Sequence, residues 1–206
     1  MIEALGKAGR PAPLYLRSLA LEHSPRLQEA VFDTHCFHIG ELRIPPLPGV
    51  VFSEAGWTAG GEAVRVRFDP AVTSLAEISK EGRRLSCITR IYLPPGAPSR
   101  GLKQPAAPMA SAKYRLAARS DRHWNLRRHP HFHLPLTPLQ RTKLNALLVY
   151  NDRREEQLLS PRQLALLRRI EAVRKAKGPG AFESLAPPED GRNLPAYTKR
   201  LEAVLE

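Results

Sequence analysis

The chain has 206 residues, the usual size of one globular domain with room for an appended segment, and 42% of them are hydrophobic. Such a chain can bury a core, which excludes a wholly disordered or collagen-like protein. Lysine and arginine number 32 against 20 acidic residues, a formal charge of +12. Residues 1–112 hold 13 basic and 10 acidic side chains, whereas residues 113–206 hold 19 and 10. A nucleic acid or other polyanion would therefore meet the second half, and a solvated basic surface would account for the same charge.

No run of about 18 apolar residues is present, and the first residues lack the apolar core of a secretory signal. We therefore expect a cytoplasmic protein without a membrane span. The two cysteines, Cys36 and Cys87, are too few for a disulfide scaffold and lack the CxxC spacing of a structural zinc site. The remaining alternatives are core packing and a reactive thiol.

The first elements in chain order are a proline-containing arm, a strand and a helix. Residues 1–29 predict an irregular arm with one short helix between positions 14 and 21. From Ala30 a strand runs to Cys36, and a short helix follows until Pro45 and Pro46 stop it. Cys36 would then stand where a strand runs into a helix, a position that favours the thiolate.

Two further strands are predicted at residues 50–52 and 63–68. In the second strand Val64, Val66 and Phe68 alternate with polar residues and indicate its buried face, and Glu62 stands at its start.

An amphipathic helix is predicted from Ser74 to about Arg84, followed by an apolar strand over residues 87–93. The order strand, helix, strand, strand, helix, strand is typical of an α+β sandwich. Residues 94–112 are rich in proline and predict a linker or an ordered surface excursion, and they give the best internal boundary.

Two similar helix starts follow in the basic half. Thr137-Pro138-Leu139-Gln140 and, 23 positions later, Ser160-Pro161-Arg162-Gln163 each combine an N-cap hydroxyl, a proline at the first helical position and the glutamine of a capping box. We expect a helical hairpin turned at Asn151-Asp152 and a last helix over residues 195–205 that packs back on it. The hairpin carries an arginine-rich face comprising Arg153, Arg154, Arg168, Arg169 and Arg174.

Four short sequence motifs follow one another between residues 36 and 70. They read CFHIGE at residues 36–41, LPGVV at 47–51, AGWTAG at 55–60 and EAVRVRFDP at 62–70. This part of the chain resembles the A-type peptide methionine sulfoxide reductases, in which the pattern runs GCFWGxE, LPGV, GYxGG and HAExVxVxFDP. The similarity is concentrated in residues 30–70.

The resemblance implies a thiol-dependent oxidoreductase with a sulfoxide-type substrate. Cys36 would attack the sulfoxide sulfur and pass through a sulfenic acid, and Glu62 would protonate the oxygen. Phe37, His38 and Trp57 would wall the substrate pocket. The thiol carries the chemistry, so no cofactor is expected, and a thioredoxin-like protein or a small thiol would restore it.

Several positions depart from the family pattern. His38 stands where the family has tryptophan, and His35 and Ile39 stand where it has glycines. A loop before Glu62 is missing, and the later NDxGxQYRS segment, whose tyrosine helps to bind the sulfoxide oxygen, has no clear copy.

The strand that corresponds to this lost segment has two possible placements in the chain. If residues 90–93 (RIYL) are equivalent, Cys87 falls near Cys36 and could resolve its sulfenic acid to a disulfide. If residues 131–140 (HFHLPLTPLQ) are equivalent, His129 takes the place of the tyrosine and the proline-rich segment is an insertion. The second placement matches the following helix better, and Cys87 remains the candidate resolving cysteine.

The histidines suggest a different class of function. His129, His131 and His133 alternate, so on an edge strand two imidazoles could reach one metal, with Cys36 or His38 completing the site. The alternative to a reductase is therefore a binding protein on the same fold, which holds a metal through Cys and His or a polyanion through its basic extension.

The sequence thus predicts three parts in an α+β protein. They are an N-terminal arm (1–29), a methionine sulfoxide reductase A-like sandwich (30–140, with the proline-rich insertion 94–112) and a basic C-terminal helical extension (141–206).

Overall fold

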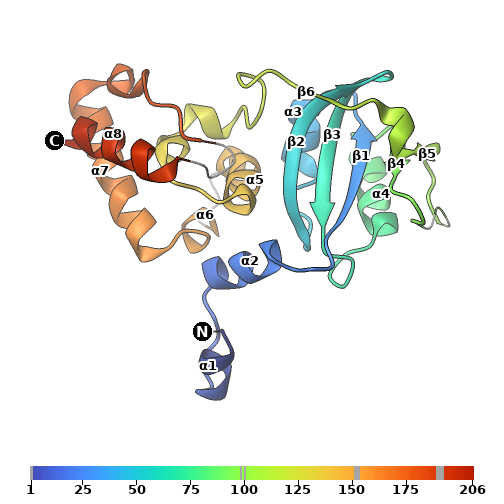
Figure 1. The fold of residues 1–206 in the computed structure, drawn as a ribbon, viewed down its shortest axis with the longest axis horizontal. Coiled ribbons are helices and arrows are strands. Elements are labelled where there is room, and N and C mark those ends of the chain that lie inside the picture. Colours follow the sequence, from blue (N-terminus) through green and yellow to red (C-terminus); the bar gives the residue numbers. More distant parts are fainter. Residues whose placement is uncertain (1, 98, 100, 151–153, 189–192) are drawn as a thin grey trace.

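The computed structural model describes residues 2–97, 99, 101–150, 154–188 and 193–206. It is a mixed α+β structure in which one six-stranded sheet has the strand order β5-β4-β1-β3-β2-β6. Figure 1 shows the sheet on one side of the molecule and helices α5 to α8 on the other, with α2 lying below both. No helix in the described ranges is both long enough and apolar enough to cross a membrane.

The N-terminal arm contains two helices, α1 (Ile2–Lys7) and α2 (Leu14–Glu22). Helix α2 confirms the short helix predicted there. Helix α1 was not predicted, and it buries none of its residues. Figure 1 shows that α1 projects away from the rest of the chain. A helix that packs against nothing needs no apolar stripe, and the sequence therefore carried no signal for it.

Strand β1 (Gln28–Asp33) leads into helix α3 (Phe37–Arg43). The strand ends three residues before the predicted end at Cys36, which instead is the N-cap residue of α3 with an extended backbone (φ −152°, ψ 124°). The helix ends before Pro45, as predicted, since proline cannot continue the hydrogen-bond ladder.

Strands β2 (Val50–Thr58) and β3 (Gly61–Phe68) form the central hairpin. The prediction for β3 is confirmed, and Val64 and Val66 are fully buried. The prediction for β2 was too short, because residues 53–58 carry polar and glycine residues. Cross-strand pairing with β3 extends the strand despite that composition.

Helix α4 (Leu75–Arg84) has the predicted start, where Ser74 and Glu77 form a capping box. Strand β4 (Arg90–Leu93) begins three residues later than predicted and pairs with β1. Cys87 lies before β4, and its backbone N–H donates to the carbonyl of Gly82 at the end of α4.

The proline-rich segment contributes to the sheet. Strand β5 (Ala106–Pro108) pairs in parallel with β4, the 3-10 helix η1 (Met109–Ala112) follows, and β6 (Arg115–Leu116) pairs with β2 at the opposite edge. Of the two predicted alternatives, an ordered surface excursion describes these residues better than a linker.

The remaining elements are η2 (Leu126–Arg128), η3 (Pro130–His133), α5 (Pro138–Leu147), η4 (Leu148–Tyr150), α6 (Arg154–Gln157), α7 (Pro161–Lys177), η5 (Pro179–Phe182) and α8 (Leu194–Leu205). Both predicted capping boxes are confirmed at α5 and α7. Their glutamines also pair, since the Nε2 of Gln140 and of Gln163 each donate to the other's Oε1, at 2.9 and 2.8 Å. The predicted turn at Asn151-Asp152 lies outside the described residues.

Two apolar clusters position these elements. One packs α3 and α4 on the sheet face that carries Phe32, Val64 and Val66. The other joins α5, α7 and α8 to the segment 126–136. Tyr197 and Leu201 of α8 are buried in it, which confirms that the last helix packs back.

Candidate active site

Cys36 lies at the end of the sheet where the chain leaves β1 and enters α3. Its thiol is free and half-buried. As the N-cap residue it has its side chain at the start of the helix, and that side chain makes no cap hydrogen bond. A half-buried thiol at a strand-to-helix junction is accessible to a small substrate while one side stays packed.

Glu62 contacts the residue next to Cys36. Its Oε2 accepts a hydrogen bond from the backbone N–H of Phe37 at 2.6 Å. Glu62 is also the cross-strand partner of Trp57, so the two side chains share one face of the hairpin. The rings of Phe37 and Trp57 meet edge to face with centroids 5.4 Å apart. The structure thus brings together four of the residues that the motifs predict as site residues.

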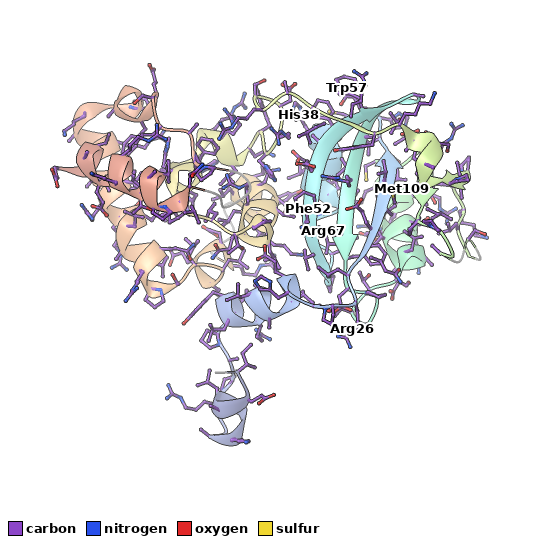
Figure 2. All side chains as sticks on the ribbon, viewed as in Figure 1. Arg26, His38, Phe52, Trp57, Arg67 and Met109 are labelled. Atoms are coloured by element: carbon purple, nitrogen blue, oxygen red, sulfur yellow. The ribbon has the colours of Figure 1, made fainter. Side chains whose placement is uncertain are left out.

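The contacts that hold the His38 side chain come from residues outside the four motifs. Its Nε2 lies 3.0 Å from the carbonyl oxygen of Asp121, an arrangement in which the Nε2–H donates. Its ring stacks on Trp124, with centroids 5.3 Å apart and an interplanar angle of 26°. The guanidinium of Arg128 lies 4.0 Å from the Trp124 ring centroid. Figure 2 shows His38 and Trp57 at the same end of the sheet.

Trp124 is therefore an aromatic residue of the site that the sequence did not reveal. It lies 88 positions after Cys36 in a segment without a motif, so no spacing rule connects the two. The only hint is that an indole occurs in an otherwise polar, basic stretch.

A buried carboxyl group fixes the hairpin from the opposite face of the sheet. Asp33 accepts hydrogen bonds from Thr58 Oγ1 at 2.6 Å and from Tyr92 OH at 3.1 Å. A Cβ at Gly60 would come within 2.4 Å of the Asp33 carboxylate, so glycine is needed there for the turn to approach. Asp33 and Tyr92 lie outside the four motifs, whereas Thr58 and Gly60 belong to the AGWTAG segment. Together these residues position β2 and β3, which carry Trp57 and Glu62.

Glu41, the glutamate of the first motif, lies under the site. It is completely buried and accepts backbone hydrogen bonds from Ala55 (3.0 Å) and His123 (2.9 Å). Burial raises its pKa to about 8, against the opposing effect of these two hydrogen bonds. Glu41 therefore ties α3 to β2 and to the segment that carries Trp124.

Glu41→Gln is expected to lower the free energy of unfolding by about 1–3 kcal/mol, because the amide nitrogen would face one of the two backbone N–H donors and leave it unsatisfied. Urea unfolding at pH 7 measures the change. Glu3→Gln, on the exposed face of α1, is the matched control and should leave stability unchanged. Equal stability of Glu41→Gln and wild type would contradict a structural role for the two hydrogen bonds.

Cys87 lies in the apolar cluster that also contains Phe37. It is almost completely buried, and its Sγ–H donates to the Gly82 carbonyl at 3.4 Å. Burial raises the pKa of the thiol, which disfavours the attacking thiolate. Its role as resolving cysteine stays a prediction.

The placement of the lost strand at residues 131–140 was wrong. Pro130 begins the 3-10 helix η3 there, with His131 and His133 inside it, because proline suits the first helical position. Residues 90–93 instead form the strand β4 beside β1.

His129 lies beside this 3-10 helix. Its ring centroid is 6.5 Å from that of His131, and its pKa is lowered by burial first and then by the charge of Arg174 on α7. These contacts place His129 with the C-terminal helices, and its role as a substrate-binding residue stays a prediction.

The predicted metal site lacks the necessary ligands. In the described part of the chain no group of three or more His, Cys, Asp or Glu side chains could hold a metal ion. The reason is local, because residues on a 3-10 helix do not share one face at alternate positions as they would on a strand.

The arginine-rich face is partly neutralised. Arg169 pairs with Glu202 of α8 at 2.7 Å, and Arg153 lies outside the described residues. Binding of a polyanion to this extension stays a prediction.

No family model and no curated protein matches the chain. Among solved structures it is similar to methionine sulfoxide reductase A of Corynebacterium diphtheriae, with 17% sequence identity and a TM-score of 0.41. That similarity covers 53% of this chain and 78% of the other.

Proposed function

We propose that the protein is a thiol-dependent oxidoreductase that reduces a sulfoxide, with Cys36 as nucleophile and Glu62 as proton donor. The observation that carries this proposal is the 2.6 Å hydrogen bond from Phe37 N–H to Glu62 Oε2. It holds the Glu62 carboxyl on the backbone of the residue that follows the half-buried Cys36, and a carboxyl group and a thiol are the two groups that sulfoxide reduction requires.

The reaction begins when Cys36 Sγ attacks the electrophilic sulfur of the sulfoxide. Glu62 transfers a proton to the oxygen, which makes it a better leaving group. The attack forms a bond between Cys36 Sγ and the substrate sulfur. As this S–S bond breaks, the protonated oxygen moves from the substrate sulfur to Sγ, so the substrate leaves as the sulfide, reduced by two electrons, and Cys36 becomes a sulfenic acid. The cysteine is therefore the species that is oxidised.

A thiol reductant closes the cycle. Its thiolate attacks the sulfenic sulfur of Cys36, releases water and forms a mixed disulfide. A second thiol of the reductant then displaces Cys36 and leaves as a disulfide. A thioredoxin-like protein or a small dithiol supplies both thiols.

Phe37 and Trp57 form apolar walls at right angles, suited to hold the methyl group on sulfur. His38 puts a smaller and more polar ring at the third wall. The A-type methionine sulfoxide reductases have a tryptophan at the position of His38. Here Trp124, from a distant part of the chain, stacks on His38 and brings an indole ring beside that position.

The direct test is consumption of an N-blocked methionine sulfoxide by the wild-type protein with dithiothreitol as reductant. Each diastereomer is assayed separately. Conversion of one diastereomer to the sulfide would support the proposal, and absence of conversion of both would contradict it.

Cys87→Ser is expected to leave turnover with dithiothreitol within about twofold of wild type, because a small dithiol reaches the sulfenic acid without a protein resolving thiol. Steady-state rates with dithiothreitol and with a thioredoxin system measure the change. A loss confined to the thioredoxin assay would support Cys87 as the resolving cysteine. Loss in both assays, with an unchanged melting temperature, would contradict the prediction.

A further inference from the structure

A cavity lies between α2, the loop after α3, and α5, and Cys36 is not among the residues that line it. Its volume is about 260 Å³. Its wall is largely apolar and includes five leucines, namely Leu14, Leu21, Leu139, Leu147 and Leu158. A cavity of this size is slightly smaller than those that hold drug-sized molecules, so it suits a small aliphatic ligand.

Two cationic side chains, Lys143 and Arg154, line this leucine cavity. The contacts of Lys143 fix the position of its ammonium group. Lys143 of α5 reaches the loop after α3, where its Nζ donates to the carbonyl of Leu47 at 2.9 Å and to that of Pro45. An ammonium group has three N–H donors, so these two acceptors leave one donor for a ligand. The side chain is thereby fixed at the cavity wall.

Lys143 has no acidic partner among the described residues. Glu22, the acidic residue of α2, instead accepts a hydrogen bond from the backbone N–H of Leu139 at 3.3 Å. Burial lowers the pKa of Lys143 to about 8, because the ammonium loses part of its hydration. Buried cations in proteins are ordinarily paired, and an anion bound here would stabilise the ammonium form of Lys143.

We propose that the leucine cavity binds a short aliphatic carboxylate, with its carboxylate on the Lys143 ammonium and its chain among the leucines. The apolar wall provides affinity through burial of the chain, and the ammonium selects the charge of the head group. This site is separate from the thiol chemistry at Cys36 and does not depend on it.

Titration of the full chain with octanoate, 1-octanol and octylamine tests the charge selection, with melting temperature and ligand-observed NMR as readouts. Octanoate is expected to raise the melting temperature in a concentration-dependent manner, because it binds the folded state alone. Octylamine, with the same chain and the opposite charge, should bind at least about tenfold more weakly. Equal binding of the two, or no binding of octanoate, would overturn the proposal.

Two variants locate the site. Lys143→Met keeps the apolar stem and removes the charge, so it should weaken octanoate by at least about tenfold while 1-octanol binding is retained. Ser18→Leu, which fills the cavity from α2, should abolish binding of both. Octanoate binding that is unchanged in either variant would place the ligand elsewhere and overturn the proposal. Should Lys143→Met fail to fold, Ser18→Leu and the wild-type charge comparison decide the matter.

Discussion

Cys36→Ser is expected to reduce sulfoxide turnover to the uncatalysed background. A serine hydroxyl is a far weaker nucleophile than a thiol, and its oxygen cannot be oxidised to the sulfenic acid level. The substitution changes one atom at a half-buried N-cap position that makes no cap hydrogen bond, so the fold should persist. The measurements are turnover of N-blocked methionine sulfoxide and the melting temperature of the same sample.

Glu62→Gln is the matched variant for the proton donor. The glutamine carbonyl can still accept the hydrogen bond from Phe37 N–H, so α3 should keep its position. The amide cannot transfer a proton, and turnover should fall by about 10²–10⁴-fold. Alkylation of Cys36 should continue in this variant, since the thiol is intact.

The combination of the two variants separates chemistry from structure. Turnover lost in both, with unchanged melting temperatures, would support the proposed roles. Wild-type turnover in Cys36→Ser would exclude Cys36 as nucleophile and would leave the thiol site without its proposed function.

Acid is expected to destabilise the protein between pH 6.5 and 4, because three buried histidines must stay neutral in the folded state. Burial lowers the pKa of His123 to about 3 and those of His131 and His133 to about 4. The unfolded chain takes up these protons near pH 6.5, and the folded chain takes them up only at lower pH. Stability from these groups is therefore full above pH 6.5 and is lost as the pH falls.

Glu41 opposes this trend. Its folded-state pKa of about 8 lies above its unfolded value, so its contribution is present below pH 4.5 and is lost as the pH rises toward 8. Three histidine protons against one carboxyl proton leave a net difference of two between pH 4.5 and 6.5. The free energy of unfolding should then fall by about 2–3 kcal/mol per pH unit on acidification.

Urea unfolding at half-unit intervals from pH 7 to pH 4.5 measures this slope. His131→Leu should reduce it by about one half, since one of the net two protons is removed. His35→Gln is the control, because His35 is exposed and should leave the slope unchanged. A flat profile in the wild type would show that the three histidines are not buried as described.

Local signals in the sequence were enough for much of the fold. The capping boxes at Thr137 and Ser160, and the hydroxyl residue Ser74, predicted three helix starts, because each start depends on hydrogen bonds within four residues. The alternation in residues 63–68 predicted β3 and its buried face for the same reason. Segments whose state depends on a distant partner were predicted less well, such as the second half of β2.

The residues of the candidate site likewise fall into those that local motifs predicted and those that only the tertiary structure revealed. Cys36, Phe37, Trp57 and Glu62 could be named from the sequence, because they belong to short motifs on elements that pair directly with one another.

Contacts across long sequence separations were decided only by tertiary structure. Three contacts each join segments more than 50 residues apart, namely the stacking of Trp124 on His38, the hydrogen bond from Tyr92 to Asp33 and the hydrogen bond from Lys143 to the carbonyl of Leu47. The histidines failed as a predicted strand for the same reason, since Pro130 and the packing of η3 against α7 gave them a helical turn. The sequence therefore determined which residues the short motifs place on neighbouring elements, because those contacts are local, and packing between distant segments decided what surrounds them.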